Sequence, residues 1–169
     1  MTDSATQLAG LFAKCAPPIA RLGKALRTKL RARLPGLTEV VYWYERQQSL
    51  VIAYSPTAQG YAAVCTLALD PEQVKLFFAG GPRLTKADPR KLLQGGGKLV
   101  RFVPMVTAAD LERVEIEALL AAALDLSKVR PVAGAKGALL IKADAQKKRA
   151  ARRRSPSRRA RRATSRVVE

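Results

Sequence analysis

Basic side chains are the most concentrated chemical feature of this sequence. The whole chain carries 31 Lys and Arg against 13 Asp and Glu, a net charge of +18, and residues 147–169 hold 11 of these bases with one acid. Arginine and lysine neutralise phosphates and release counterions, which gives an affinity that falls steeply with salt and depends little on base sequence. The run predicts binding to nucleic acid or another polyanion. The residues expected to make the contacts are Lys147, Lys148, Arg149, Arg152, Arg153, Arg154, Arg158, Arg159, Arg161 and Arg162.

A second basic group surrounds three consecutive glycines, Gly95, Gly96 and Gly97. Successive glycine N–H groups can form an anion-binding nest, and Lys91 and Lys98 flank the glycines here. A nucleotide P-loop is excluded, because the Walker pattern requires Ser or Thr after its Gly-Lys pair and this chain has leucine there. The alternative is a helix C-cap and turn in which a glycine adopts positive φ.

Aromatic residues at 42–44 offer a third kind of contact. Tyr42 and Tyr44 share one face of a predicted strand and Trp43 takes the other, so at most one face can be exposed. An exposed face of this kind would stack nucleic-acid bases. The alternative is ordinary packing of aromatic side chains in the core or across strands.

Catalytic and metal-binding chemistry has little support in the sequence. The chain contains no histidine, which removes the commonest general base and metal ligand. Ser49 and Ser55 have no base at a suggestive spacing. Cys15 and Cys65 lie far apart without a CxxC pattern, which predicts no disulfide, a reducing cytoplasm, and a Cys65 that packs as a small hydrophobe. We therefore predict no catalytic residue, no metal site and no cofactor.

The elements that position these groups are organised around residues 61–81, the least polar long run. It predicts two strands joined by a turn at Asp70-Pro71-Glu72, the first of them covered on both faces. Further strands are predicted over 39–44, 49–54, 98–103 and 138–142. Helices are predicted around 8–12, and over 19–34, 88–93 and 107–126, the last opened by a capping box at Thr107 and Asp110. This order favours an α+β fold with an antiparallel sheet of five to six strands and helices packed on one face.

The chain divides into three parts by composition. Residues 1–17 form an N-terminal segment with a short helix, residues 18–144 form one α+β domain, and residues 145–169 form an Arg/Lys-rich tail that is predicted to be disordered. No apolar run reaches 18 residues, which predicts no membrane association.

Five segments of the sequence resemble the YdhG-like family, a bacterial domain of unknown function. They are SLVIAYSPT (49–57), VKLFFAGGPRL (74–84), DPRKLLQGGGKLVRF (88–102), TAADL (107–111) and the end of the domain at 137–149. The resemblance covers about residues 34–148 and implies a compact α+β fold related in outline to frataxin.

Some members of that family are discussed as frataxin-like iron chaperones, which hold iron with carboxylates. The helix that would match, 19–34, carries six bases and no acid. Glu112, Glu115 and Glu117 form the nearest acidic group, and we expect them to be a solvated helix face.

The sequence thus predicts a non-enzymatic YdhG-like domain whose basic tail binds nucleic acid or another polyanion without strong sequence preference. A stripe on the second helix, formed by Arg21, Lys24, Arg27 and Arg31, could extend the contact surface. The alternatives are a frataxin-like iron chaperone, a domain that binds a small anionic ligand with an incidental tail, or a protein-interaction module whose tail docks an acidic partner.

Overall fold

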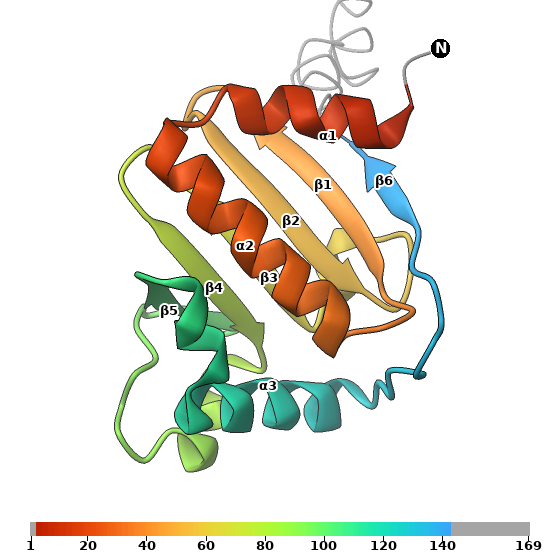
Figure 1. Ribbon diagram of the computed structural model, residues 1–169. Helices are drawn as coiled ribbons and strands as arrows, with labels where there is room; N and C mark the ends of the chain where they lie inside the picture. Colours follow the sequence, from red (N-terminus) through yellow and green to blue (C-terminus); the bar gives the residue numbers. More distant parts are fainter. Residues whose placement is uncertain (1–2, 143–169) are drawn as a thin grey trace, which may run out of the picture.

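Six strands form a single mixed sheet with helices against it (Figure 1). The computed structural model describes residues 3–142. The strands are β1 (Thr38–Tyr44), β2 (Ser49–Ser55), β3 (Cys65–Leu69), β4 (Val74–Ala79), β5 (Val100–Met105) and β6 (Leu139–Ile141). The α-helices are α1 (Ser4–Ala13), α2 (Pro17–Arg33) and α3 (Val114–Ser127), and the 3₁₀ helices are η1 (Gly60–Ala62), η2 (Gly81–Ala87) and η3 (Ala108–Glu112). The α+β class is confirmed.

The strand order is β5-β4-β3-β2-β1-β6. Neighbours from β5 to β1 pair antiparallel, as predicted, and both predicted hairpins form. The second hairpin begins at Cys65 rather than at Tyr61, because Gly60–Ala62 form the 3₁₀ helix η1 and leave Tyr61 exposed. The sheet is not wholly antiparallel, because β6 pairs parallel to β1. After α3, the chain crosses back along the sheet before it pairs, so it arrives beside β1 running in the same direction (Figure 1).

One face of the sheet carries the core. Leu67 of β3 and Leu76 of β4 are fully buried, as are Leu26 and Leu30 of the helix α2 that covers them. Helix α2 approaches closely at Gly23, where an added Cβ would lie 2.3 Å from a Leu69 methyl carbon. Only glycine leaves room for this contact.

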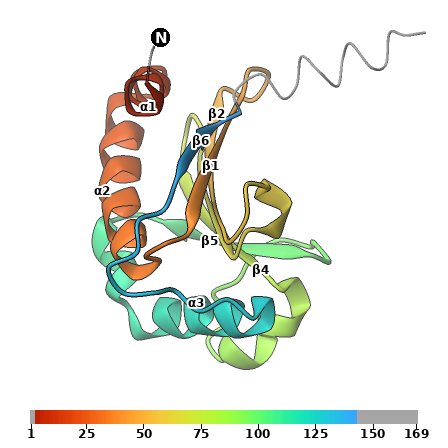
Figure 2. The same ribbon diagram turned by 90° about the vertical axis from the view of Figure 1, so that its right-hand side faces the viewer.

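The opposite face carries no α-helix (Figure 2). Helices α1 and α2 lie on one face as predicted, and α3 lies across one end of the sheet, where it packs on β4 and η2. Strand β3 is central, between β4 and β2, as predicted, but no α-helix of the described residues covers its second face. On that face Ala68 is buried and Thr66 is partly exposed.

Local signals explain where several elements begin. Pro17 and Pro18 occupy the first turn of α2, where the missing N–H groups cost nothing. The capping box is confirmed, with the Asp110 carboxylate accepting from the Thr107 backbone N–H at 3.0 Å. It opens η3 rather than a long helix, because Arg113 has an extended backbone and α3 begins at Val114.

Two predictions near β5 are wrong for identifiable reasons. Residues 88–93 form no helix, because the buried Asp88 carboxylate accepts from the N–H groups of Leu92 and Leu93 at 2.7 and 2.9 Å and holds a turn. Strand β5 continues through Pro104 to Met105. As an edge strand it tolerates a residue that cannot donate a ladder bond.

The predicted disordered tail, residues 145–169, and its ten proposed contact residues lie outside the described residues. Across residues 3–142, no helix is long and apolar enough to cross a membrane.

Candidate anion-binding surfaces

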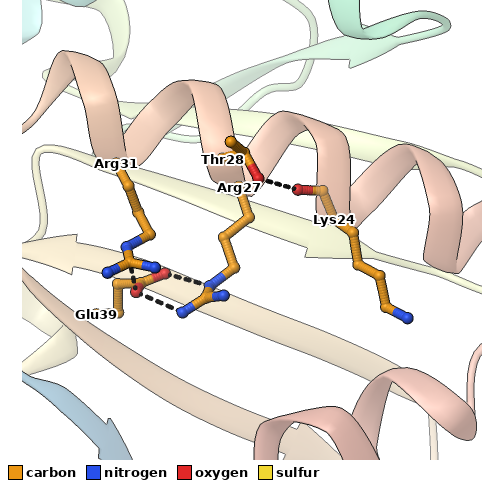
Figure 3. A network of polar contacts seen from close by, with 5 residues as sticks. All are labelled: Lys24, Arg27, Thr28, Arg31 and Glu39. Atoms are coloured by element: carbon orange, nitrogen blue, oxygen red, sulfur yellow. Dashed lines mark hydrogen bonds and ion pairs between the residues drawn. The ribbon is translucent and has the colours of Figure 1, made fainter. Parts of the chain in front are cut away.

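A buried carboxylate organises the polar contacts between α2 and β1 (Figure 3). Arg27 donates two hydrogen bonds to Glu39, from Nε to Oε2 at 2.7 Å and from Nη2 to Oε1 at 2.9 Å. Arg31, one turn later, adds a longer ion pair of 3.4 Å to Oε1. The Glu39 side chain is only 6% exposed, whereas that of Arg31 is 59% exposed. Arg27 therefore neutralises the buried acid and Arg31 is left as surplus positive charge.

A cavity of about 560 Å³ opens beside this network. It lies between the end of α2, the start of β1 and the segment that leads into β6. Its polar lining comes from Thr28, Arg31, Glu39, Tyr54 and Lys136. The remaining lining residues are Ala32, Leu34, Pro35, Gly36, Leu37, Ala135 and Gly137.

The Tyr54 hydroxyl is the unusual group of this cavity. Tyr54 is 1% exposed, and its hydroxyl has no hydrogen-bond partner among residues 3–142. Burial raises the pKa of Tyr54 well above its ordinary value, and the nearby Glu39 carboxylate adds to the rise. The group is therefore neutral at physiological pH, and Glu39, its cross-strand neighbour, is an acceptor close by but not placed for a regular hydrogen bond.

The predicted basic stripe on α2 is only partly free. Arg27 is bound to both oxygens of Glu39, and the Lys24 ammonium lies 5.6 Å from the centre of the Phe12 ring, whereas Arg31 adds only a longer ion pair and stays mostly exposed. Arg21 is exposed and makes no ion pair with any described residue. Half of the stripe thus has a structural role, which the spacing of the residues alone could not reveal.

The three acids near the start of α3 are ion-paired rather than simply solvated. Glu112 meets Lys29 and Glu117 meets Arg33, both on α2, while Glu115 meets Arg90 and Arg113. The Lys29 contact lowers the pKa of Glu112. No group of three or more His, Cys, Asp or Glu within residues 3–142 is arranged to hold a metal ion.

Most acids among the described residues are engaged by ion pairs or backbone N–H groups, so the charges left unpaired are mainly positive. Six acids form ion pairs, and Asp3, Asp88 and Asp110 accept bonds from backbone N–H groups at element ends. Many bases, by contrast, make no ion pair with residues 3–142. These are Lys14, Arg21, Lys24, Arg46, Arg83, Lys86, Lys91, Lys98, Arg101, Lys128, Lys136 and Lys142.

The predicted anion nest lies in the exposed turn before β5. Gly95 has a φ of +98°, which supports the turn interpretation, but residues 88–94 are not helical, so Gly95 does not cap a helix and the C-cap alternative is wrong. Gly96, Gly97, Lys91 and Lys98 are exposed in the same segment. Anion binding at this turn stays a prediction.

The aromatic residues at 42–44 divide between the two faces as predicted. Trp43 is buried on the helix side and donates from Nε1 to Glu45 at 2.6 Å. Tyr42 and Tyr44 lie on the face of the sheet opposite α1 and α2, here called the open face, and are stacked with ring centres 6.2 Å apart. A second pair, Phe77 and Phe102, lies on the same face with centres 5.1 Å apart. The sequence analysis missed that pair, which depends on the register between β4 and β5.

The remaining candidate groups have structural roles. Cys65 is buried, which confirms its predicted packing, and burial raises its pKa to about 12. The Ser49 hydroxyl donates to Asp70 at 3.2 Å, and that of Ser55 donates to the Gln59 carbonyl at 2.8 Å. None of these groups is arranged as an activated nucleophile.

No family model, curated protein or solved structure matches this chain. The resemblance to the YdhG-like family therefore stays a prediction carried by the sequence segments given above. A fold of this class hosts many unrelated functions, so function must be argued from the surfaces themselves.

Proposed function

We propose that the protein is a non-enzymatic domain that binds nucleic acid or a similar polyanion through its basic tail. The imbalance of charge carries this proposal. Nearly all acids of residues 3–142 are engaged internally, while many bases on the same surface are unpaired and the tail adds a net charge of +10. Such a chain attracts phosphates from a distance and repels other cations.

The open face of the sheet favours nucleic acid over an acidic protein. Tyr42, Tyr44, Phe77 and Phe102 present partly exposed rings there, and every base has a π face on which such rings can stack. Strand β6 ends beside β1, because the Lys142 backbone N–H donates to the Val41 carbonyl at 2.7 Å. Lys142, the last described residue, therefore lies at the edge of the sheet beside the strand that carries the tyrosine pair.

The test is a fluorescence titration of the full chain with a single-stranded oligonucleotide. One variant replaces Arg152–Arg154, Arg158, Arg159, Arg161 and Arg162 with glutamine, and a matched control replaces the same residues with lysine. We expect the glutamine variant to lose most of its affinity and the lysine control to keep it, because charge rather than guanidinium shape drives this contact. Equal affinity of the wild type and the glutamine variant would refute the role of the tail.

Co-purification with and without nuclease then separates nucleic acid from other polyanions. Bound nucleic acid that is lost when the sample is treated with nuclease supports the proposal. An acidic protein that stays bound after nuclease treatment supports the protein-docking alternative instead.

A further inference from the structure

The cavity beside Glu39 has the features of a small-ligand site, and it is separate from the basic tail. We propose that it binds a small organic oxyanion, a carboxylate or a phosphate ester, through Arg31, Lys136 and the Tyr54 hydroxyl. Its volume of about 560 Å³ falls within the range of small-molecule pockets, roughly 300–1,000 Å³.

The chemistry of the lining selects an anion. Among residues 3–142, Glu39 is the only acid in the lining, and Arg27 already binds both of its oxygens. Arg31 and Lys136 therefore leave the cavity with excess positive charge. The Thr28 hydroxyl already donates a hydrogen bond to the Lys24 carbonyl at 3.1 Å. The groups that remain unsatisfied are donors, so the ligand must bring acceptor oxygens.

The Tyr54 hydroxyl makes this more than a basic surface. A buried hydroxyl without a partner is costly, and such groups in folded proteins are normally satisfied by protein, water or ligand. Tyr54 and Arg31 both line the cavity, and we assign them to the oxyanion as a buried donor and an exposed one.

The other wall of the cavity is apolar. Leu34 and Leu37 are buried there, beside Ala32, Pro35 and Ala135. This composition suits a ligand with a hydrocarbon or aromatic portion attached to its anionic group. Gly137 passes so close to the Leu37 carbonyl oxygen, 1.8 Å from where a Cβ would stand, that no side chain fits there. Backbone hydrogen bonds hold the crossover segment at the cavity rim, from the Glu39 N–H to the Ala138 carbonyl at 2.8 Å and from the Val132 N–H to the Pro35 carbonyl at 3.3 Å.

The experiment is an NMR titration of the full chain with phenyl phosphate, benzoate and inorganic phosphate. A salt concentration of about 150 mM limits long-range attraction by the tail, because the screening length there is about 8 Å. We expect saturable shifts of the Gly36 and Gly137 amides with phenyl phosphate or benzoate, and weaker binding of inorganic phosphate. Arg31→Ala should weaken binding about tenfold and Tyr54→Phe about threefold to tenfold, from the usual strengths of charged and neutral hydrogen bonds.

The matched control is Arg46→Ala, which removes the same charge from the exposed turn at the far end of β1. It should leave the affinity unchanged. The proposal is overturned if no probe shifts Gly36 or Gly137, if Arg46→Ala weakens binding as much as Arg31→Ala, or if Tyr54→Phe binds as tightly as the wild type. Equal binding of phenyl phosphate and inorganic phosphate would overturn the role of the apolar wall.

Discussion

Replacing Tyr54 with phenylalanine should stabilise the unliganded protein. The change removes a hydroxyl that is buried without a partner among residues 3–142 and keeps the aromatic ring that packs in the core. An unsatisfied buried polar group costs about 1–3 kcal/mol. The space left by the hydroxyl adjoins an existing cavity, so little new empty volume is created. We therefore expect the free energy of unfolding to rise by about 1–3 kcal/mol.

Urea unfolding followed by circular dichroism measures this change directly, and the melting temperature should rise by roughly 2–4 °C per kcal/mol. Tyr61→Phe is the matched control, because Tyr61 is 90% exposed and water already satisfies its hydroxyl. The control should change stability by less than about 0.5 kcal/mol. A loss of 1 kcal/mol or so in Tyr54→Phe would show that the hydroxyl has a strong partner in solution, and the reasoning about the cavity would fail.

Three further predictions test the packing and the buried charges. Gly23→Ala should destabilise the protein by about 1–3 kcal/mol, because its Cβ would overlap Leu69 of β3. Gly10→Ala, where nothing lies within 4 Å of the added Cβ, should stabilise it by about 0.5–1 kcal/mol. A melting temperature for Gly23→Ala equal to or above that of Gly10→Ala would contradict the close packing of α2. Glu39→Gln should cost about 2–3 kcal/mol by leaving a partly buried arginine unpaired, against less than about 0.5 kcal/mol for Asp125→Asn in an exposed pair; equal urea midpoints would refute the difference. The buried Cys65 thiol should contribute its full stabilisation below about pH 9 and lose it between about pH 9 and 12, because the thiol of the unfolded chain releases its proton at lower pH. Urea titrations should therefore show a free energy of unfolding that falls over this range, and less steeply in Cys65→Ala. The same fall in both proteins would contradict the prediction.

Much of the fold follows from local sequence patterns. The two hairpins appear because alternating apolar residues are separated by turn residues, and the box at Thr107 and Asp110 is visible from its spacing. The parallel strand β6 could not be predicted in the same way. Its direction depends on the path of the whole crossover after α3, and three residues of strand carry no information about which neighbour they pair with.

The candidate cavity was harder to predict than the fold. Arg27 and Arg31 share a helix face in the sequence, but only the packing of α2 on β1 brings them to Glu39. Tyr54 looks like an ordinary core residue of an apolar strand. Its unpaired hydroxyl becomes apparent only when the surrounding side chains are in place. A single acid in a strand, opposite a helix without acids, was the one available signal.

The salt dependence of oligonucleotide binding tests the central proposal most directly. The measurement is the slope of log K against log salt concentration for the full chain and for the variant with the seven tail arginines changed to glutamine. Each lost phosphate contact on a single strand reduces the slope by about 0.7, so we expect it to become shallower by up to about 5. Identical slopes for the two proteins would contradict polyanion binding by the tail.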